Sequence, residues 1–243
     1  MMFRENATVV VVHGAWADGS SWNAVILPLE KKGLRVIAAP IPLTSLGDDV
    51  AAVKRTLART SGPVVLAGHA YGGAVIAAAD DERVKALVYI AGLAPIEGET
   101  VAQVFYRDER HPQAPQLAPD SDGLIWMPKQ SFGNAFAHHA TPDQIALSAA
   151  VQRPIALKCI QEPFPRPAWK SKPSWFLIAE EDRMINPKTQ HFMAQRMAAT
   201  KRALPVDHTP LLSAPEDVVD VVMEAAEATL SPAFERTSRE KAS

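Results

Sequence analysis

The run AGHAYGGA at positions 67–74 has the spacing of a catalytic turn, with an unexpected residue at its apex. Gly68 and Gly72 stand two residues before and two residues after Ala70. Glycines so placed are typical of the tight strand-to-helix turn that presents a nucleophile, because little room is left beside the apex. Alanine carries no oxygen or sulfur, so Ala70 cannot attack a carbonyl group. The pattern alone is weak evidence, and other features must support it.

A carboxylate and an imidazole follow later, each directly after a predicted strand. Asp182 lies in EEDRMI, where a carboxylate can hold an imidazole in one tautomer. Glu180 and Glu181 are the alternative carboxylates in the same stretch, and Asp182 is favoured by its spacing from the strand. His208 lies in VDHTPLLSAPE, just before the last predicted helix. We expect Asp182 and His208 to work together at the turn.

The stretch VVHGAW, at the end of the first predicted strand, offers backbone donors. The turn there can direct the N–H of Ala15 at a developing oxyanion, and the N–H of Tyr71, just after the apex, is the second candidate donor. The neighbouring imidazoles have simpler interpretations. His13 is expected to bond the loop backbone, and His69 is expected to be a packing residue.

Several other residues are candidates for a site. Candidate substrate-binding aromatics, each equally well explained as core, are Trp16, Trp126, Phe132 and Phe136. His138 and His139 suggest a metal, but no Cys, Asp or Glu at ligand spacing accompanies them in the sequence, so we expect a solvated surface and no metal site. The single cysteine, Cys159, lies in an apolar stretch and is expected to be packed.

Short, continuously apolar runs alternate with helical patterns along the chain. Such runs are typical of strands buried on both faces of a parallel sheet. The predicted strands cover residues 8–14, 35–40, 63–69, 85–92, 174–180 and 200–207. Helix starts are predicted at Asn186-Pro187 and at two capping boxes, Thr141 with Gln144 and Ser213 with Glu216. The alternation predicts an α/β fold with a doubly wound, mostly parallel sheet.

The alternation of strands and helices breaks between residues 95 and 172, which hold half of the twenty prolines. An insertion with its own apolar residues predicts a helical cap over the C-terminal edge of the sheet, where ligands bind in open α/β sheets. We therefore expect a core at 1–94 and 173–230, a cap at 95–172 and a frayed tail at 231–243.

The composition limits the classes of partner. The 243 residues carry a net charge of −2, which does not favour nucleic-acid binding. No apolar run is long enough to span a bilayer, no signal peptide is evident, and one cysteine permits no intrachain disulfide. We expect a cytoplasmic protein that acts on a small molecule without a cofactor, since no phosphate-binding glycine loop is present. The sequence does not decide whether the chain forms a homodimer.

These motifs together resemble the α/β-hydrolase superfamily. The order of turn, Asp and His is that of α/β-hydrolases and differs from chymotrypsin-like and subtilisin-like enzymes. The chain looks most like the small, capped, esterase-like branch that includes plant methylesterases, hydroxynitrile lyases and bacterial relatives. The resemblance extends from about residue 7 to about residue 229, is strongest at HGAW, GHAYGG, EEDRMI and DHTPLLSAP, and is weak in the cap.

The resemblance implies a role for each candidate residue. Ala70 takes the nucleophile position, Asp182 that of the acid and His208 that of the base. Ala15 and Tyr71 take the positions of the oxyanion-hole donors. The alanine is the one departure from the family pattern, and it closes the covalent acyl-enzyme route.

Three hypotheses account for this alanine. The chain is an ester hydrolase scaffold whose serine at position 70 was replaced, or a natural enzyme that uses His208 and Asp182 without covalent chemistry, as in cofactor-free lyases or oxygenases. The third is a non-catalytic small-molecule binding protein. The first is the preferred hypothesis, because the acid, the base and the oxyanion loop are all retained.

Overall fold

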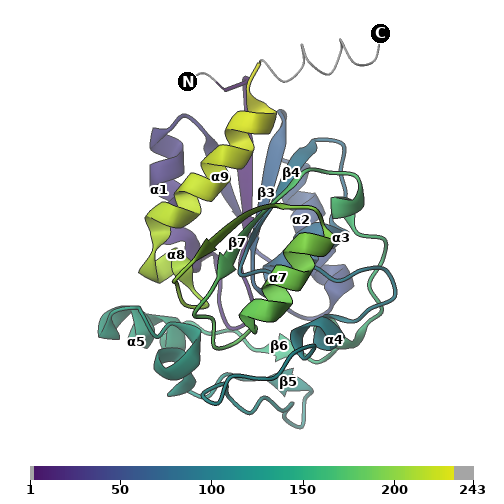
Figure 1. The fold of residues 1–243 in the computed structure, drawn as a ribbon. Helices are drawn as coiled ribbons and strands as arrows, with labels where there is room; N and C mark the ends of the chain where they lie inside the picture. The colour runs from purple at the N-terminus through teal and green to yellow at the C-terminus, as the bar shows by residue number, and fades with distance from the viewer. Residues whose placement is uncertain (1–2, 233–243) are drawn as a thin grey trace.

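The computed structural model describes residues 3–232, and within them six parallel strands form the central sheet in the order β2-β1-β3-β4-β7-β8 (Figure 1). The strands are β1 (Thr8–Val12), β2 (Arg35–Ala39), β3 (Val64–His69), β4 (Val84–Ile90), β7 (Ser174–Ala179) and β8 (Thr200–Leu204). The parallel α/β sheet predicted from the sequence is confirmed.

Burial across the sheet explains why the strand sequences differ. Every residue of β1, β3 and β7 is buried, because helices cover both faces of these inner strands. The edge strands β2 and β8 begin with exposed residues and carry arginine and lysine. The continuous apolar runs of the sequence therefore mark the centre of the sheet.

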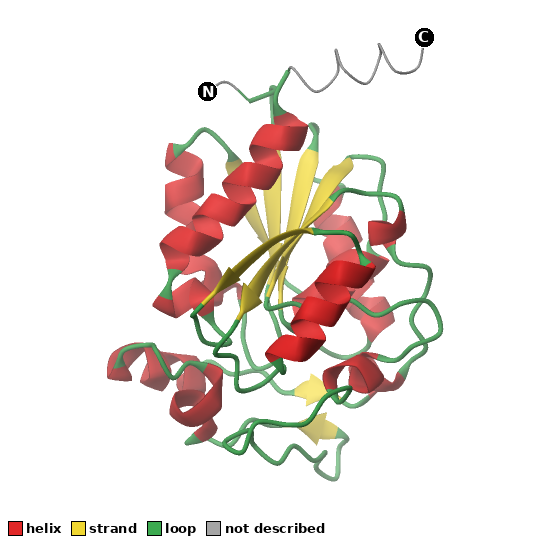
Figure 2. Ribbon diagram, viewed as in Figure 1, coloured by secondary structure: helices red, strands yellow, loops and turns green. Residues whose placement is uncertain are grey.

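Helices form a layer on each side of the sheet (Figures 1 and 2). One layer contains α1 (Asn23–Lys31) and α9 (Pro215–Leu230), with α8 (Pro210–Ser213) and the 3-10 turn Gly19–Trp22 beside them. The opposite layer contains α2 (Leu46–Leu57), α3 (Tyr71–Ala78) and α7 (Pro187–Arg196). Each layer seals a separate apolar core, so alternate residues of β1 enter different cores.

Two of the three predicted helix starts are observed. Asn186 caps α7, and the Thr141–Gln144 capping box opens α5 (Pro142–Ala150). The capping box predicted at Ser213 is wrong, because α9 begins at Pro215 with no side-chain cap. The Ser213 hydroxyl instead donates to the Asp207 carboxylate at 2.6 Å, so a tertiary partner replaces the local one.

The segment between β4 and β7 lies at the C-terminal ends of the strands, at the bottom of Figure 1. Its elements are α4 (Val101–Phe105), β5 (Leu124–Ile125), the π-helical turn Phe132–Phe136, α5, β6 (Ile155–Ala156), α6 (Lys158–Gln161) and the 3-10 turn Ala168–Lys170. Strands β5 and β6 pair antiparallel as a small second sheet. We call this segment, residues 95–172, the cap.

Among the described residues, no helix has both the length and the apolar character needed to cross a bilayer. The predicted frayed tail lies outside the described residues from position 233 onward.

Candidate active site

The turn at residues 68–72, here called the elbow, joins β3 to α3 in a strained conformation. Ala70 at its apex has φ 48° and ψ −117°, which non-glycine residues rarely adopt. A Cβ atom on Gly68 would lie 2.4 Å from the Gly72 carbonyl oxygen, and one on Gly72 would lie 2.5 Å from the Val12 carbonyl oxygen. Only glycine fits at both positions, because backbone atoms occupy the space.

The Asp182 carboxylate holds His208 at the end of the sheet. His208 Nδ1 donates to Asp182 Oδ2 across 2.8 Å, and both side chains are almost completely buried. Asp182 also accepts the backbone N–H groups of Met184 (2.7 Å) and Ile185 (2.9 Å) and the side-chain amide of Gln190 (2.7 Å). With Nδ1 engaged in this way, Nε2 is the ring nitrogen available to a bound molecule.

The His69 side chain is hydrogen-bonded to the backbone of the loop that carries His208. Its Nε2 donates to the His208 carbonyl oxygen across 2.8 Å, and the two ring centroids are 5.0 Å apart. Burial lowers the pKa of His69 to about 3, and the neighbouring His208 adds to the effect, so His69 is neutral at physiological pH. His69 was expected only to pack, and it also fixes the backbone that carries His208.

The two candidate oxyanion donors lie on neighbouring loops. Ala15 follows β1 and Tyr71 is the first residue of α3, so the Tyr71 N–H has no acceptor within its helix. Both residues line one pocket together with Ala70. Trp16, next to Ala15, has φ 57°, a second strained position at this edge of the sheet. His13 Nδ1 bonds to the Gly14 carbonyl oxygen at 2.9 Å, as expected for a loop residue.

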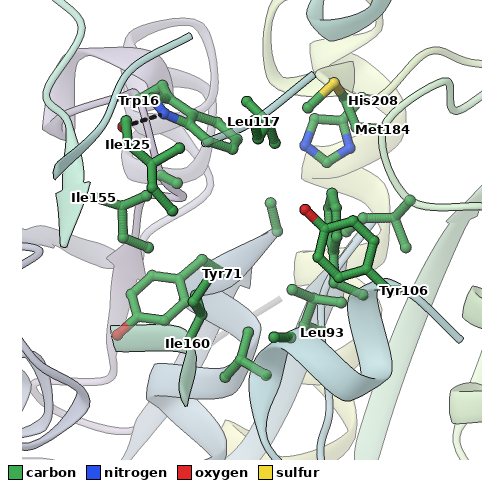
Figure 3. Close-up of a pocket in the computed structure, with 16 residues that line it drawn as sticks. Trp16, Tyr71, Leu93, Tyr106, Leu117, Ile125, Ile155, Ile160, Met184 and His208 are labelled. Carbon is green, nitrogen blue, oxygen red and sulfur yellow. Dashed lines mark hydrogen bonds between the residues drawn. The ribbon is translucent and has the colours of Figure 1, made fainter. Parts of the chain in front are cut away.

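An apolar pocket with an empty volume of about 590 Å³, open solvent at its mouth included, lies between the elbow and the cap. His208 and Trp16 face it from opposite sides in Figure 3. The remaining described lining residues are Ala15, Ala70, Tyr71, Leu93, Val101, Ala102, Phe105, Tyr106, Leu117, Ile125, Ile155, Ile160, Met184 and Ile185. Within this described lining, His208 is the one histidine.

Three of the four predicted substrate-binding residues lie outside this pocket. Trp126 is 48% exposed and donates its indole N–H to Asp120 Oδ2 at 3.2 Å. Neighbouring residues of a strand point to opposite faces, and Ile125 of β5 takes the pocket-facing position. Phe132 is fully buried and packs edge-on against Phe136 at 5.3 Å, behind the pocket wall. Of the predicted substrate-binding set, the structure brings only Trp16 to the pocket.

Sequence reasoning missed most of the apolar lining. Leu93, Met184 and Ile185 come soon after strand ends, so their position was a usable signal. Tyr106 lies in the cap, and Figure 3 shows its hydroxyl directed toward the middle of the pocket. The other cap residues belong to no motif, because long-range packing brings them to the pocket.

A buried carboxylic acid stands behind the elbow. The Tyr71 hydroxyl donates to Asp49 Oδ2 across 2.7 Å, and Asp49 Oδ1 accepts the Leu43 N–H at 2.7 Å. Cys159 is buried as expected, and its thiol lies 3.7 Å from the same carboxylate. Burial raises the pKa of Asp49 and that of Cys159, the latter to about 12, so the thiol is unreactive. This cluster ties α2, the elbow and α6 together.

A carboxylate from a distant part of the sequence lies beside the adjacent imidazoles of the cap. Among the described residues, His138, His139 and Glu181 form one group that could hold a metal ion. Glu181 comes from the loop after β7, so sequence spacing could not reveal the contact. The group is separate from the residues that line the pocket.

Three solved structures resemble this fold over most of their length. A pyrethroid hydrolase from Sphingobium faniae JZ-2 matches with a TM-score of 0.78 and 21% identity, covering 93% of this chain and 98% of that one. Polyneuridine aldehyde esterase matches at 0.75 and 16%, covering 91% and 100%. A variant of tomato methylketone synthase I, complexed with beta-ketoheptanoate, matches at 0.75 and 16%, covering 92% and 99%. At these identities the likeness shows a shared fold.

The sequence comparison identifies the family directly. A model of the alpha/beta hydrolase family matches residues 9–221, which include β1, the elbow, the loop after β7 and the loop that carries His208. The match covers most of the chain, and esterase-like enzymes are among its structural neighbours. The chain therefore belongs to the alpha/beta hydrolase family.

Proposed function

We propose that this alpha/beta hydrolase binds a small, largely apolar ester and hydrolyses it by general-base catalysis, with water in the place of a serine hydroxyl. One observation carries the proposal: His208 lines the pocket together with Ala70 while Asp182 holds its Nδ1 at 2.8 Å. An imidazole oriented in this way can take a proton through Nε2. The Ala70 methyl group leaves the nucleophile position without an oxygen of its own.

The reaction uses water as the nucleophile. As the water oxygen bonds to the ester carbonyl carbon, one water proton passes to His208 Nε2 and the carbonyl electron pair moves to its oxygen. The N–H groups of Ala15 and Tyr71 then donate to that oxyanion. When the carbonyl re-forms, the bond to the alcohol oxygen breaks and Nε2 returns its proton to the leaving alkoxide. Asp182 stabilises the imidazolium between these steps.

The pocket supports an apolar acyl or alcohol group as the part of the substrate that is bound. Its lining is almost entirely aliphatic and aromatic, and burial of such a group contributes about 25 cal/mol per Å². The structural likeness to polyneuridine aldehyde esterase supports an ester as the substrate class. We propose a small molecule as the partner and no covalent intermediate.

A second candidate function is cofactor-free lyase or oxygenase chemistry, in which His208 acts directly on the substrate. The absence of a hydroxyl at Ala70 favours it, since nothing then competes for Nε2. The fold it shares with a methylketone synthase that is complexed with beta-ketoheptanoate adds support. A small-molecule binding protein without turnover is the third candidate.

Substitution at the apex tests the proposal. Ala70→Ser is expected to raise kcat/KM on short p-nitrophenyl esters by at least about a hundredfold, because a triad nucleophile contributes on the order of 10⁶ in rate. His208→Ala is expected to reduce the slow hydrolysis by the Ala70 protein to the background rate. The measurement is p-nitrophenolate release under pseudo-first-order conditions.

The controls separate the candidates. No gain from Ala70→Ser would contradict the placement of Asp182 and His208 as a working pair at this apex. Turnover of beta-ketoheptanoate or a cyanohydrin by the Ala70 protein, lost in His208→Ala and without ester hydrolysis, would favour the lyase. Binding of these compounds without turnover in either form would favour the binding protein.

A further inference from the structure

Three potential metal ligands meet where the cap contacts the sheet core. His138 and His139 follow the π-helical turn Phe132–Phe136 of the cap, and Glu181 lies in the loop after β7. One ring nitrogen of each histidine and one carboxylate oxygen of Glu181 all lie within 4.8 Å of one another. The two imidazole rings are 4.4 Å apart in an edge-on arrangement, so both present to the same space.

The spacing of these atoms suits a cation with nitrogen and oxygen ligands. His139 Nε2 lies 3.0 Å from Glu181 Oε2. Ligand atoms around a tetrahedral Zn²⁺ with bonds of about 2.0–2.1 Å lie about 3.4 Å apart. The exposed side chains of His139 and Glu181 can rotate, and such rotation would bring their ligand atoms to this distance from a His138 nitrogen.

His138 supplies a second, independent indication. Both of its ring nitrogens are shielded from solvent, and neither makes a hydrogen bond to the described residues. The Ala135 carbonyl is close enough to influence the ring but falls outside hydrogen-bonding geometry. Buried polar atoms are rarely left without a partner, because burial without one costs on the order of 1–3 kcal/mol. A bound cation would satisfy one of the two nitrogens.

The charges around the group are net negative, which favours a bound cation. Glu181 carries a negative charge in the group, and Asp207 is near enough to the His138 ring to act on it electrostatically. Arg183 acts in the opposite direction, with its guanidinium donating to the Asn134 carbonyl at 2.9 Å. The two carboxylates and one guanidinium give a net negative setting.

We propose that His138, His139 and Glu181 bind a divalent transition-metal cation, Zn²⁺ or a close equivalent, that clamps the cap to the loop carrying Asp182. Imidazole nitrogens select such cations over Mg²⁺ and Ca²⁺. Glu181 immediately precedes Asp182, and the His139 N–H donates to Asp207, which precedes His208, at 2.8 Å. The cation would join the cap to the loop after β7, beside the hydrogen bond that already joins His139 to the loop carrying His208. The proposal is independent of the reaction catalysed.

Zinc titration of the untagged, chelator-treated protein tests the site. Isothermal titration with ZnCl₂ is expected to give a stoichiometry of one Zn²⁺ bound per chain. Co²⁺ bound in its place is expected to show the visible absorption bands of an ion with a low coordination number. His139→Ala and Glu181→Gln, both at exposed side chains, should each lower the affinity by more than the roughly 10–100-fold that loss of an outer-sphere partner costs. Their melting temperatures in chelator should match that of the parent protein.

A matched control is the pair formed by Glu180 of the same loop and His191 of α7. His191 Nε2 is 2.8 Å from Glu180 Oε1, which makes an exposed His–Glu pair without a second imidazole. His191→Ala should leave zinc binding unchanged. Equal zinc affinity in His138→Ala and His191→Ala, or no heat and no cobalt spectrum up to millimolar metal, would overturn the proposal.

A separate measurement tests whether the bound cation stabilises the attachment of the cap to the core. Zinc at about a hundredfold excess over its Kd is expected to raise the melting temperature by about 5–10 °C. Hydrogen exchange around residues 137–141 and 205–209 should slow in the parent protein and not in Glu181→Gln. Exchange that is unchanged by zinc in the parent protein would overturn the clamp.

Discussion

The C-terminal edge of the sheet and the cap above it are built in different ways. At the sheet edge, each candidate catalytic residue lies within four residues of the end of a parallel strand: Ala70 after β3, Asp182 after β7 and His208 after β8. Backbone ladders fix these positions whatever the side chains are. In the cap, short elements such as β5 and β6 place the pocket residues through packing between distant segments. The difference separates the region that holds the candidate catalytic residues from the region that supplies the other part of the pocket lining.

Three of the bonds that join the two regions use backbone atoms of the cap. The His139 N–H donates to Asp207, the Thr209 hydroxyl donates to the Phe136 carbonyl at 2.6 Å, and the Trp16 indole donates to the Ile125 carbonyl at 2.9 Å. On the cap side, each of these bonds uses a main-chain atom. Other bonds to the core use cap side chains, among them those of Gln144, Arg153 and Glu99, so the attachment depends on both the backbone and the side chains of the cap.

The largest effect is expected from adding a methyl group at the sheet edge. Gly72→Ala would place a Cβ atom 2.5 Å from the Val12 carbonyl oxygen, so β1 and the elbow would have to separate. We expect a loss of at least about 3 kcal/mol in the free energy of unfolding, measured by urea denaturation.

The matched control is a glycine of the cap. In Gly133→Ala the added Cβ atom meets nothing closer than the Ile145 side chain at 3.6 Å. Its cost should stay within about 0.5 kcal/mol. Equal losses in the two variants would refute the contrast between a rigid edge and a tolerant cap.

The second effect concerns acid stability and His69. Its pKa is lowered by burial from 6.5 to about 3, so between these values the unfolded chain binds a proton that the folded chain does not. Stability therefore falls as the pH drops below 6.5, by about 1.4 kcal/mol per pH unit, or about 2 kcal/mol by pH 5. His69→Gln should reduce the pH dependence in urea denaturation measured from pH 7 to pH 5, with the remainder due to other imidazoles whose pKa is lowered by burial, such as His13, whereas exposed His191→Gln should leave it unchanged. An unchanged slope in His69→Gln would refute the assignment.

A smaller effect is expected from the buried acid behind the elbow. Tyr71→Phe removes the hydroxyl that donates to Asp49 across 2.7 Å and leaves the buried carboxyl with fewer donors. We expect a loss of about 1–2 kcal/mol in the free energy of unfolding. Tyr106→Phe in the cap, at a side chain that is 45% exposed, should change it by less than about 0.5 kcal/mol. A larger loss in Tyr106→Phe than in Tyr71→Phe would reverse the comparison.

The smallest effect is expected at Trp126. Its side chain faces away from the pocket, so Trp126→Ala should leave KM for a p-nitrophenyl ester within about twofold in the Ala70→Ser background. Trp16→Ala, which removes a pocket wall, should raise KM at least about tenfold under the same conditions. Steady-state kinetics with both variants decides whether the two tryptophans differ in this way.

The sequence predicts the sheet edge well, because parallel strands leave a local record of continuous apolar residues. Once the strands are placed, the residues that follow Ala179 and Leu204 must come together at one edge, and Asp182 and His208 lie there. The same reasoning cannot tell which carboxylate of the loop contacts His208, since Glu180 and Glu181 lie in the same loop as Asp182. The contact of Glu181 with the cap depends on tertiary structure alone.

The cap leaves a weaker record in the sequence. Trp126 rather than Ile125 attracts attention because it is aromatic, yet the pairing of β5 with β6 decides which of them faces the pocket. The Ser213 hydroxyl loses its predicted capping role to a carboxylate that is close only in the folded chain. Local patterns fail wherever a partner from a distant segment offers the stronger interaction.

The strained apex has a consequence for how this protein can change over generations. Ala70 keeps its conformation of φ 48° and ψ −117° through the glycines and strands around it, so the conformation does not depend on a reactive side chain. Alanine and serine codons differ by a single base. A serine that arises here by one mutation would enter a backbone already shaped to present it, so covalent and non-covalent descendants of this chain are neighbours in sequence space.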